Sequence, residues 1–357
     1  MKKKVTLRKK LNYKLKPNKE KINYIYIMVF NCFAFLLLTS VVVSADFLQR
    51  FEDWKNRFEY MHDGQDMYQV LKKWYHNDKH IESVNSMNET YVLGHNQFSG
   101  MDRDDFRKYL IQQYLDRKIG GMYENLPTSY KESINWVEQG AVTPVKDQGQ
   151  CGSCWSFSTT GALEGAYYIK NDELLSFSEQ QLVDCDNLRN GGRDHGCNGG
   201  LMDNAFNWIG KNNGLCTEND YPYVSGTTTQ PGECEKTCSV VSQSDVNKAY
   251  DVKPSSDEEM MTALSQQPVS IAIQADQRDF QLYKSGVFTG KCGTELDHGV
   301  LVVGYDSEDS EDYYLVKNSW GETWGESGFI KLGRGKQYNN GDGQCGMLLQ
   351  GSYPILE

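Results

Sequence analysis

The stretch Gln148-Gly149-Gln150-Cys151-Gly152-Ser153-Cys154-Trp155 places two cysteines and a glutamine directly before a long apolar run. That run carries Glu164 as its only charge before it ends near Lys170, which predicts a buried helix. A cysteine in the first turn lies at the positive end of the helix dipole, which lowers the thiol pKa and supplies nucleophilic thiolate. Gln148, six residues earlier, can donate a side-chain N–H to an oxyanion formed at the same point. The stretch therefore predicts a nucleophilic Cys154 with electrophilic support close by.

A base and a residue that could orient it follow far downstream, in Leu296-Asp297-His298-Gly299 and Lys317-Asn318-Ser319-Trp320-Gly321. Together with Cys197-Asn198-Gly199-Gly200, these segments stand in the order of a known pattern. The chain resembles the papain family of cysteine proteases, of the cathepsin L type. The resemblance implies an α+β, papain-like fold with two lobes. The N-terminal lobe is helical, the C-terminal lobe is β-rich, and the active-site cleft lies between them.

By this resemblance the chain is a cysteine endopeptidase that hydrolyses peptide bonds through a thioester acyl-enzyme on Cys154. His298 is the base that pairs with Cys154 as an imidazolium and later protonates the leaving amine. Asn318 orients the imidazole ring, and Trp320 covers that hydrogen bond from water. Gln148 and the backbone amide of Cys154 stabilise the oxyanion. No metal ion and no organic cofactor are expected.

Substrate-binding residues are implied by the same resemblance. Gly199 and Gly200 leave backbone exposed to pair with an extended peptide, and Gln350 falls at a pocket floor, where an amide should tolerate Arg only weakly. An apolar residue is expected at the second position before the scissile bond, because the walls of that pocket are apolar: Leu201, Met202, Ala272 and Leu296. Residues 213–238 contain no His pair of the kind that makes cathepsin B a dipeptidase, so endopeptidase activity is expected.

The chain has ten cysteines, and Cys32 lies in an N-terminal apolar segment. The nine that remain imply one free thiol in an oxidising compartment. The resemblance implies the disulfides Cys151–Cys197 and Cys292–Cys345. It also pairs Cys185 with Cys234 or Cys238 and leaves the other of these two for Cys216, a choice that the sequence does not make.

Residues 1–21 are strongly basic, and the apolar run 25–43 that follows them ends in Val43-Ser44-Ala45. These features predict a signal peptide within residues 1–45, cleaved after Ala45. An uncleaved signal anchor is the alternative, since the run is nearly long enough to cross a bilayer, and Met28 is an alternative start to Met1. Either reading takes the chain into the secretory pathway, with a lysosome, another acidic vesicle or secretion as the destination.

Residues 46–125 are polar, with aromatic residues at helical spacing, and the resemblance identifies them as an inhibitory propeptide ahead of a peptidase domain at 126–357. An independent helical domain is the alternative. Propeptides of this type carry Glu, Arg, Phe, Asn, Ile and Asn at helical spacing. Here those positions are Asp66, Val70, Trp74, Asn77, Ile81 and Asn85. The ion pairs that the missing Arg usually anchors are therefore expected to differ.

A second propeptide motif, Gly-x-Asn-x-Phe-x-Asp, reads Gly94, Asn96 and Phe98, with Gly100 in place of the Asp. We expect the propeptide to leave at low pH, where its acidic groups protonate and lose their contacts. The sequon Asn88-Glu89-Thr90 in this segment predicts a glycosylation site.

The net charge of the chain is −11, and from Leu126 onward 16 basic against 33 acidic residues give −17. Such a surface argues against nucleic acid as a partner. The expected partners are peptide and protein substrates, the chain's own propeptide and cystatin-type inhibitors, and the chain is expected to be a monomer.

The last third of the chain is rich in short β-forming segments. They lie at residues 269–273, 299–305, 313–318 and 328–332. His298 is thus expected to open one strand and Asn318 to close another. The acidic run 306–312 between two strands is expected to form a solvated loop.

Two alternatives to a protease remain. Cys151-Gly152-Ser153-Cys154 is also a Cys-x-x-Cys segment, as in thiol–disulfide oxidoreductases, although the βαβ context of those enzymes is absent around it. A peptide-binding homologue without catalysis is the second alternative. Such proteins usually lack the nucleophile, which is present here.

Overall fold

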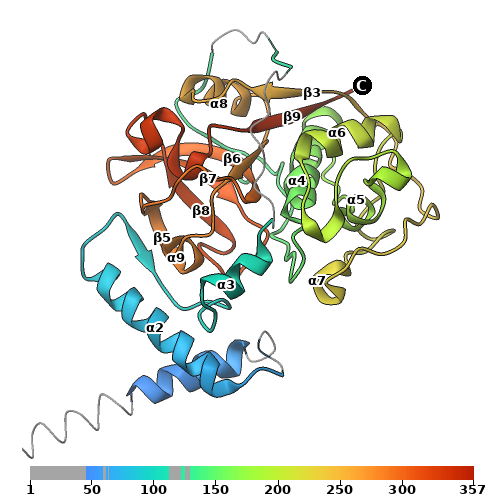
Figure 1. Ribbon diagram of the computed structural model, residues 1–357. Coiled ribbons are helices and arrows are strands. Elements are labelled where there is room, and N and C mark those ends of the chain that lie inside the picture. Colours follow the sequence, from blue (N-terminus) through green and yellow to red (C-terminus); the bar gives the residue numbers. More distant parts are fainter. Residues whose placement is uncertain (1–45, 59–61, 63, 112–121, 125–128) are drawn as a thin grey trace, which may run out of the picture. The chain divides into compact units, whose positions relative to one another are not determined.

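The computed structural model describes residues 46–58, 62, 64–111, 122–124 and 129–357 (Figure 1). The chain divides into two compact units, residues 1–59 and 60–357. In the first unit residues 46–58 form a helix, and Phe51, Trp54 and Phe58 are buried at spacings of three and four. The predicted signal segment 1–45 lies outside the described residues. Within the described ranges no helix combines the length and apolarity needed to span a membrane.

The described part of the second unit begins with a helical segment, and β1, a short strand of the sheet, follows it. Helix α2 (Met67–Asn85) is capped by the Asp66 carboxylate, which accepts a hydrogen bond from the Tyr68 amide at 3.0 Å. Val70, which stands where the family motif has Arg, is 1% exposed, so an apolar side chain is buried at this position. The Asn77 amide donates to the Ser99 and Met101 carbonyls and fixes the chain that follows the helix.

Helices dominate the chain between residues 150 and 230. The longest, α4, starts at the predicted residue and is buried over most of its length, as its apolar sequence requires. Gly161 allows it to approach the sheet, because a Cβ there would lie 2.8 Å from the Leu301 side chain. The helices of the unit after α2 are α3 (Arg103–Phe106), η2 (Arg107–Tyr109), α4 (Cys154–Asn171), α5 (Glu179–Cys185), η3 (Leu188–Asn190), η4 (Gly196–Asn198), α6 (Met202–Lys211), α7 (Ser225–Thr228), α8 (Asp257–Leu264), α9 (Arg278–Gln281), η5 (Tyr338–Gly341) and η6 (Gln344–Gly346).

The strands form one mixed sheet in the order β1-β5-β8-β7-β6-β4-β9-β3, with β2 paired to β6. Strand β1 belongs to the part of the chain before residue 125 and pairs antiparallel with β5. This part of the chain therefore adds the outermost strand to the sheet. The strands are β1 (Tyr91–Leu93), β2 (Ile134–Asn135), β3 (Val246–Val252), β4 (Val269–Ile273), β5 (Tyr283–Phe288), β6 (His298–Glu308), β7 (Glu311–Lys317), β8 (Phe329–Gly333) and β9 (Gly351–Leu356).

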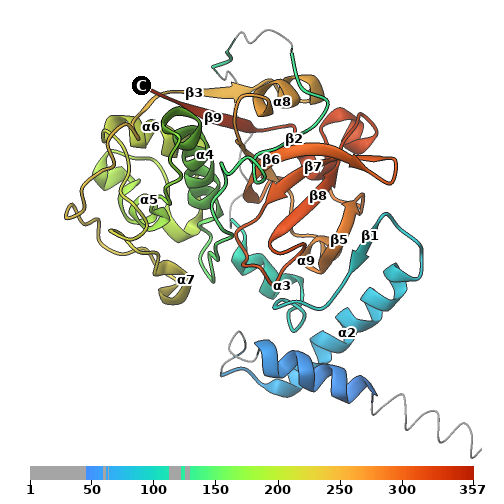
Figure 2. The ribbon, with the colours of Figure 1, turned by 180° about the vertical axis from the view of Figure 1, so that it is seen from behind.

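The expected α+β architecture is confirmed, with α4, α5 and α6 on one side and the sheet on the other (Figures 1 and 2). The two halves meet along α4 and strands β4 and β6. The Ser158 hydroxyl of α4 donates to the Val300 carbonyl at 2.7 Å, and the Ser270 hydroxyl donates to the Ser158 carbonyl at 2.7 Å. The fold therefore brings the start of α4 beside the start of β6.

One expectation for this region is wrong. The acidic run 306–312 forms a paired hairpin, because β6 continues to Glu308 and β7 begins at Glu311. Asp309 and Ser310 form the turn with φ values of 50° and 71°, a conformation suited to a tight turn between two strands.

Candidate active site

Cys154 is the first residue of α4, and among the described residues it is the free cysteine. Its Sγ accepts a hydrogen bond from the Gly299 amide at 3.3 Å. Gly299 is needed there, because a Cβ at this residue would lie 3.2 Å from the Trp155 Cα and 3.3 Å from the Cys154 carbonyl oxygen. The thiol thus lies at the N-terminus of a buried helix and against the first residues of β6.

His298 opens β6, as predicted, and Asn318 directly follows β7. Nε2 of His298 lies 2.7 Å from Oδ1 of Asn318, so the imidazole is held by the side-chain amide. The Nδ1 atom has no hydrogen-bond partner among the described residues, which leaves it available to the thiol. Trp320 stacks on the imidazole, with ring centroids 4.5 Å apart and planes at 24°. The indole therefore covers the His298–Asn318 pair.

Gln148 is fully buried, and its side-chain amide is fixed at both ends. Oε1 accepts a hydrogen bond from the Ser319 hydroxyl at 2.7 Å. Nε2 donates to the Cys151 carbonyl at 3.0 Å and to the Tyr109 carbonyl at 2.8 Å. The donor expected to stabilise an oxyanion is thus occupied by a peptide carbonyl from the preceding segment.

Residues Tyr109 to Ile111 lie across the thiol site. The Ile111 amide donates to the Asp297 carbonyl at 2.9 Å. A Cβ added to Gly199 would lie 2.5 Å from the Ile111 side chain, so this side chain packs directly against Gly199. The Leu110 carbonyl faces Gly152. This segment therefore covers Gly199, a residue that the resemblance assigns to substrate binding.

Burial determines the protonation of the two reactive groups in this state. It raises the pKa of the Cys154 thiol to about 12, against the smaller effect of the Gly299 amide. Burial also lowers the pKa of His298 to about 4, although its bond to Asn318 acts in the opposite sense. Under the covering segment the pair is thus thiol and neutral imidazole.

The remaining predicted substrate residues lie around the same site. Gly199 and Gly200 follow η4, and a Cβ on Gly200 would lie 2.6 Å from the Trp155 ring. Leu201 is half-buried, and the other apolar pocket residues are buried, namely Met202 at the start of α6, Ala272 in β4 and Leu296 before Asp297. The Gln350 carbonyl accepts from the Ala272 amide at 3.0 Å, so this residue also lies beside β4.

The cysteines pair as Cys151–Cys197, Cys185–Cys234, Cys216–Cys238 and Cys292–Cys345. The structure thereby answers the question that the sequence left open about Cys216. Cys151 is bonded to Cys197 and is not a partner for Cys154, which removes the dithiol that a thiol–disulfide oxidoreductase requires. That alternative is wrong. Across the described ranges, no cluster of His, Cys, Asp or Glu could hold a metal ion.

Ion pairs also join residues on the two sides of residue 125, in addition to those formed by acidic groups within the expected propeptide. Asp276, whose side chain is 1% exposed, accepts hydrogen bonds from Arg103 at 2.6 Å and from Arg107 at 2.7 Å. Asp279 likewise pairs with His80. In these two contacts the carboxylate lies after residue 125 and its partner before it, and acidic groups before residue 125 form further pairs, such as Asp102 and Asp105 with Lys73.

Sequence reasoning missed some contributors to the site. Ser319 orients the Gln148 amide, and its place in the Asn-Ser-Trp-Gly segment was the available signal. Tyr109 supplies the carbonyl on Gln148, and nothing local in the sequence indicates this, because 39 residues separate the two.

Residues 130–355 match the family model described as papain family cysteine protease, and residues 51–106 match the cathepsin propeptide inhibitor domain (I29). A probable cysteine protease of Arabidopsis thaliana, RD21C, is 45% identical over 284 residues, which cover 78% of this chain and 61% of the relative. The thiol protease SEN102 of Hemerocallis sp. is 42% identical over 317 residues, 85% of each chain. The chain thus spans about three fifths of the length of the RD21 relatives.

Solved proforms have the same fold. The ragweed pollen allergen Amb a 11, a cysteine protease in its proform, superposes with a TM-score of 0.77 at 34% identity, covering 87% of this chain and 94% of that chain. The recombinant stem bromelain precursor gives the same TM-score and identity, covering 87% of this chain and 99% of that chain.

Proposed function

Because the chain belongs to the papain family of cysteine proteases, we propose that it is a cysteine endopeptidase made as a zymogen. One observation carries the proposal. A free thiol lies at the N-terminus of a buried helix, beside a histidine that Asn318 holds by one ring nitrogen. In this arrangement Cys154 is the nucleophile, His298 is the base and Asn318 is the orienting residue.

The neutral thiol and imidazole belong to the covered state. Once residues 109–111 leave, water returns to the site, and the helix dipole favours the Cys154 thiolate over the thiol. His298 then carries the proton that later goes to the leaving amine. The Gln148 amide, released from the Tyr109 carbonyl, becomes available to the oxyanion of the tetrahedral intermediate.

The inhibitory segment is proposed to be residues 46–125 and the peptidase domain residues 126–357. Hydrogen bonds from Gln274, Arg107 and Arg103 lower the pKa of Asp276 despite its burial, and His80 lowers that of Asp279 in the same way. A carboxylate with a lowered pKa stabilises the contact above the ordinary value near 4 and loses this contribution as the pH falls further. Acid should therefore release the segment through carboxylates at residues 276 and 279.

The proposed substrate is an extended peptide with an apolar residue at the second position before the scissile bond. Three buried apolar side chains support this preference, those of Met202, Ala272 and Leu296. Gly199 and Gly200 are proposed to pair with the peptide backbone, and Gln350, as a neutral amide, to accept Arg only weakly.

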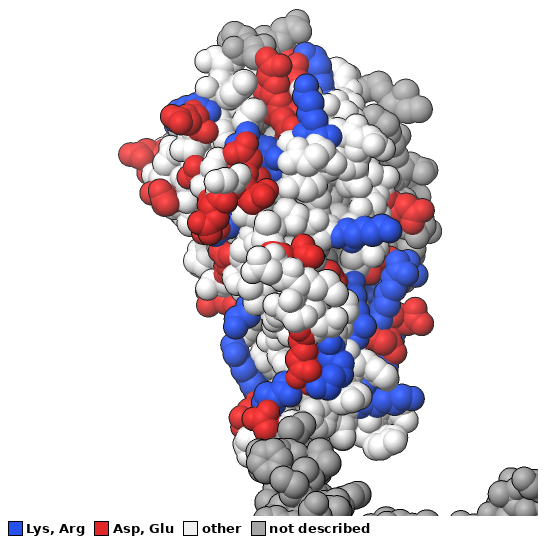
Figure 3. All heavy atoms as spheres, turned by 90° about the vertical axis from the view of Figure 1, so that its left-hand side faces the viewer, with Lys and Arg blue, Asp and Glu red and all other residues white. Residues whose placement is uncertain are grey.

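Four disulfides support passage through the secretory pathway, since they form in oxidising compartments. We keep a lysosome, another acidic vesicle or secretion as the proposed destination, and cystatin-type inhibitors as proposed partners. On the face drawn in Figure 3, acidic side chains lie between the basic ones. This supports a partner other than nucleic acid.

The test is hydrolysis of fluorogenic dipeptides with Phe, Leu or Arg at the second position. Acid-treated, mildly reduced protein is compared with Cys154→Ala prepared in the same way. We expect activity with Phe and Leu, little with Arg, and none in the variant. If the segment before residue 126 is shown to be removed and the wild-type protein remains inactive, the peptide-binding alternative replaces this proposal.

A further inference from the structure

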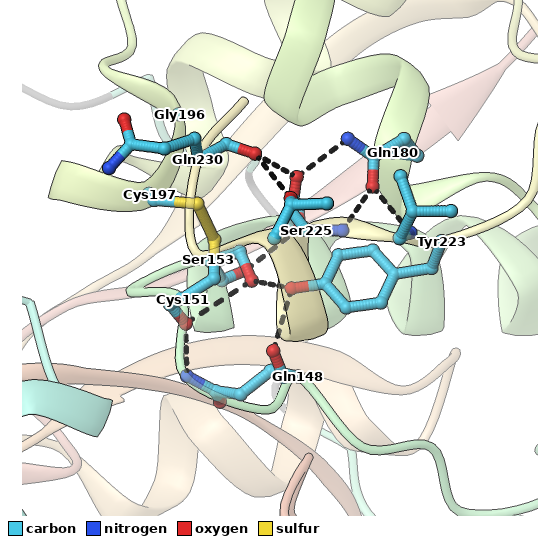
Figure 4. The surroundings of a disulfide bond; sticks show 12 residues. Gln148, Cys151, Ser153, Gln180, Gly196, Cys197, Tyr223, Ser225 and Gln230 are labelled. Atoms are coloured by element: carbon cyan, nitrogen blue, oxygen red, sulfur yellow. Dashed lines mark hydrogen bonds between the residues drawn. A yellow bond between two sulfur atoms is a disulfide. The ribbon is translucent and has the colours of Figure 1, made fainter. Parts of the chain in front are cut away.

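The Tyr223 hydroxyl lies between Gln148 and Ser153, two residues of the loop that leads into α4 (Figure 4). It donates a hydrogen bond to the main-chain carbonyl of Gln148 at 2.7 Å. The Ser153 hydroxyl lies 2.7 Å from the same oxygen. Because the Tyr223 proton is used on Gln148, Ser153 is the donor of this second bond. One phenol thus joins Gln148 to the residue directly before Cys154.

Tyr223 is itself held firmly. Its ring meets Phe157 of α4 edge-on, with centroids 4.9 Å apart, and its amide donates to Glu218 at 2.8 Å. The next two amides, of Val224 and Ser225, both donate to Oε1 of Gln180 at 2.8 and 2.9 Å. Gln180 belongs to α5, so the position of the phenol is set by two helices.

The chain after Tyr223 also presses against the Gln148 loop. The Gln150 amide donates to the Gly226 carbonyl at 3.0 Å. A Cβ on Gly149 would lie 2.5 Å from that carbonyl oxygen, and one on Gly226 would lie 2.8 Å from the Gln148 carbonyl oxygen. The contact is therefore between two backbones and leaves little space for the loop to move toward Tyr223.

The side chain of Gln148 depends on this support. Ser319 fixes the orientation of the amide, but the distance between Nε2 and the thiol site depends on where the main chain of Gln148 lies. An oxyanion donor acts only when it is within hydrogen-bond distance of the developing charge, and a displacement of about 1 Å can cost about a hundredfold in rate.

We propose that Tyr223 is a positioning residue for peptide hydrolysis, which holds the main chain of Gln148 and the Ser153–Cys154 step at a fixed separation through its hydroxyl. The inference rests on the proposed function and extends it to a residue outside the catalytic set. Burial raises the pKa of the Tyr223 phenol, so the hydroxyl remains a donor throughout the working range of pH.

The test separates oxyanion stabilisation from thiol reactivity. Acid-processed enzyme is titrated with an irreversible epoxide inhibitor to count active sites. Hydrolysis of the Phe dipeptide and alkylation of Cys154 by iodoacetamide are then measured on the same preparation. Alkylation needs the thiolate but forms no oxyanion, whereas hydrolysis needs both.

For Tyr223→Phe we expect kcat per active site to fall about tenfold or more with KM nearly unchanged, while the alkylation rate stays within about twofold of the wild type. Ser153→Ala removes the second hydrogen bond of the phenol. It should lower the ratio of the hydrolysis rate to the alkylation rate by less than Tyr223→Phe does. It also decides the question if Tyr223→Phe does not fold. The matched control is Tyr221→Phe, whose hydroxyl bonds Asp184 in the same Tyr-Pro-Tyr segment, and it should leave the ratio unchanged.

The proposal is overturned if hydrolysis by Tyr223→Phe stays at the wild-type rate. It is also overturned if hydrolysis and alkylation fall together, because that pattern indicates general damage to the fold. If the wild-type enzyme alkylates but hydrolyses nothing, the proposed function fails first, and the role of Tyr223 fails with it.

Discussion

Gln148 connects three parts of the molecule through one buried amide. Its oxygen is bonded to Ser319, its nitrogen to the Tyr109 carbonyl, and its main chain to Tyr223. The nitrogen that now binds the covering segment is the one expected to bind an oxyanion. On the proposed function, inhibition and catalysis would thus use the same donor.

We predict that Gln148→Ala lowers kcat about a hundredfold or more, because an oxyanion donor is lost. Gln150→Ala is the matched control, since this side chain is exposed on the same loop. Both are compared on the Phe dipeptide after active-site titration. Equal activity of the two variants would exclude Gln148 from transition-state stabilisation.

Asp194 and Asp186 form a buried carboxyl pair next to Gly200, one of the proposed substrate-binding glycines. Oδ1 of Asp194 accepts hydrogen bonds from the Leu201 amide and the Asn204 side chain, at 3.0 and 2.9 Å. Oδ2 of each carboxyl group finds no donor in the described part of the chain. Burial and the neighbouring Asp186 raise the pKa of Asp194. The folded state therefore holds a proton there that the unfolded chain releases near pH 4.

A pKa raised by folding means that stability declines as the pH rises above about 4. We predict that Asp194→Asn raises the free energy of unfolding at pH 8 by about 1 kcal/mol or more and flattens its dependence on pH. Urea unfolding at pH 5 and pH 8 in the Cys154→Ala background measures this without proteolysis. Glu173→Gln, an exposed carboxylate of the same lobe, should follow the parent. A lower stability of Asp194→Asn at pH 8 would contradict the argument.

Among the elements, α4 carries a buried carboxyl group, that of Glu164, as well as the proposed nucleophile Cys154. Glu164, in the middle of the helix and 1% exposed, accepts from Thr143 at 2.6 Å, Lys146 at 3.1 Å and the Phe177 amide at 3.1 Å. Lys146 also binds Glu179 of α5 at 2.6 Å. The network thus connects α4 with α5 and with the chain that leads to Gln148.

We predict that Glu164→Gln lowers the free energy of unfolding by about 3–5 kcal/mol, because it leaves a partly unpaired buried network. Urea unfolding at pH 7 in the Cys154→Ala background measures the change. Glu132→Gln, on an exposed side chain, is the control and should be neutral. A loss below about 1 kcal/mol would mean that the network contributes little beyond ordinary surface pairs.

At the scale of the whole molecule, two kinds of contact hold residues 91–107 of the proposed inhibitory segment, and they differ in their response to pH. Strand β1 extends the sheet, while Phe98 and Phe106 pack edge-on against Trp320, with centroids 5.3 and 5.2 Å apart. These contacts do not titrate. The pairs of Arg103 and Arg107 with Asp276 titrate through the carboxylate, and on the proposed function they would make release depend on acid.

Removing the cations should raise the pH at which the segment leaves. We predict that the double variant Arg103→Gln/Arg107→Gln is half-processed roughly half a pH unit above the wild type, a modest shift because both arginines are partly exposed and screened. Gel analysis of acid-treated protein over a pH series gives the midpoint. Lys72→Gln, an exposed lysine of α2, should leave it unchanged. An unchanged midpoint in the double variant would assign release to other groups.

The sequence by itself determined where several local elements begin, and it led to the choice of the residues that are proposed to react. Three of these elements follow from patterns within a few residues: the start of α4 at Cys154, the start of β6 at His298 and the strand at 269–273. Nine cysteines after residue 45, and hence one thiol without a partner among them, likewise follow from the sequence alone. These properties could be predicted because propensity, dipole and periodicity act over short stretches of chain.

Only the tertiary structure decided which distant groups meet. Four contacts are of this kind. They are the disulfide between Cys216 and Cys238, the hydrogen bond from Gln148 to the Tyr109 carbonyl, the pairs of Arg103 and Arg107 with Asp276, and the hydrogen bond from Tyr223 to Gln148. Each joins residues 22 to 173 positions apart along the chain. No local preference selects among such partners, because the choice depends on how the helices and the sheet pack and on which polar groups that packing buries together.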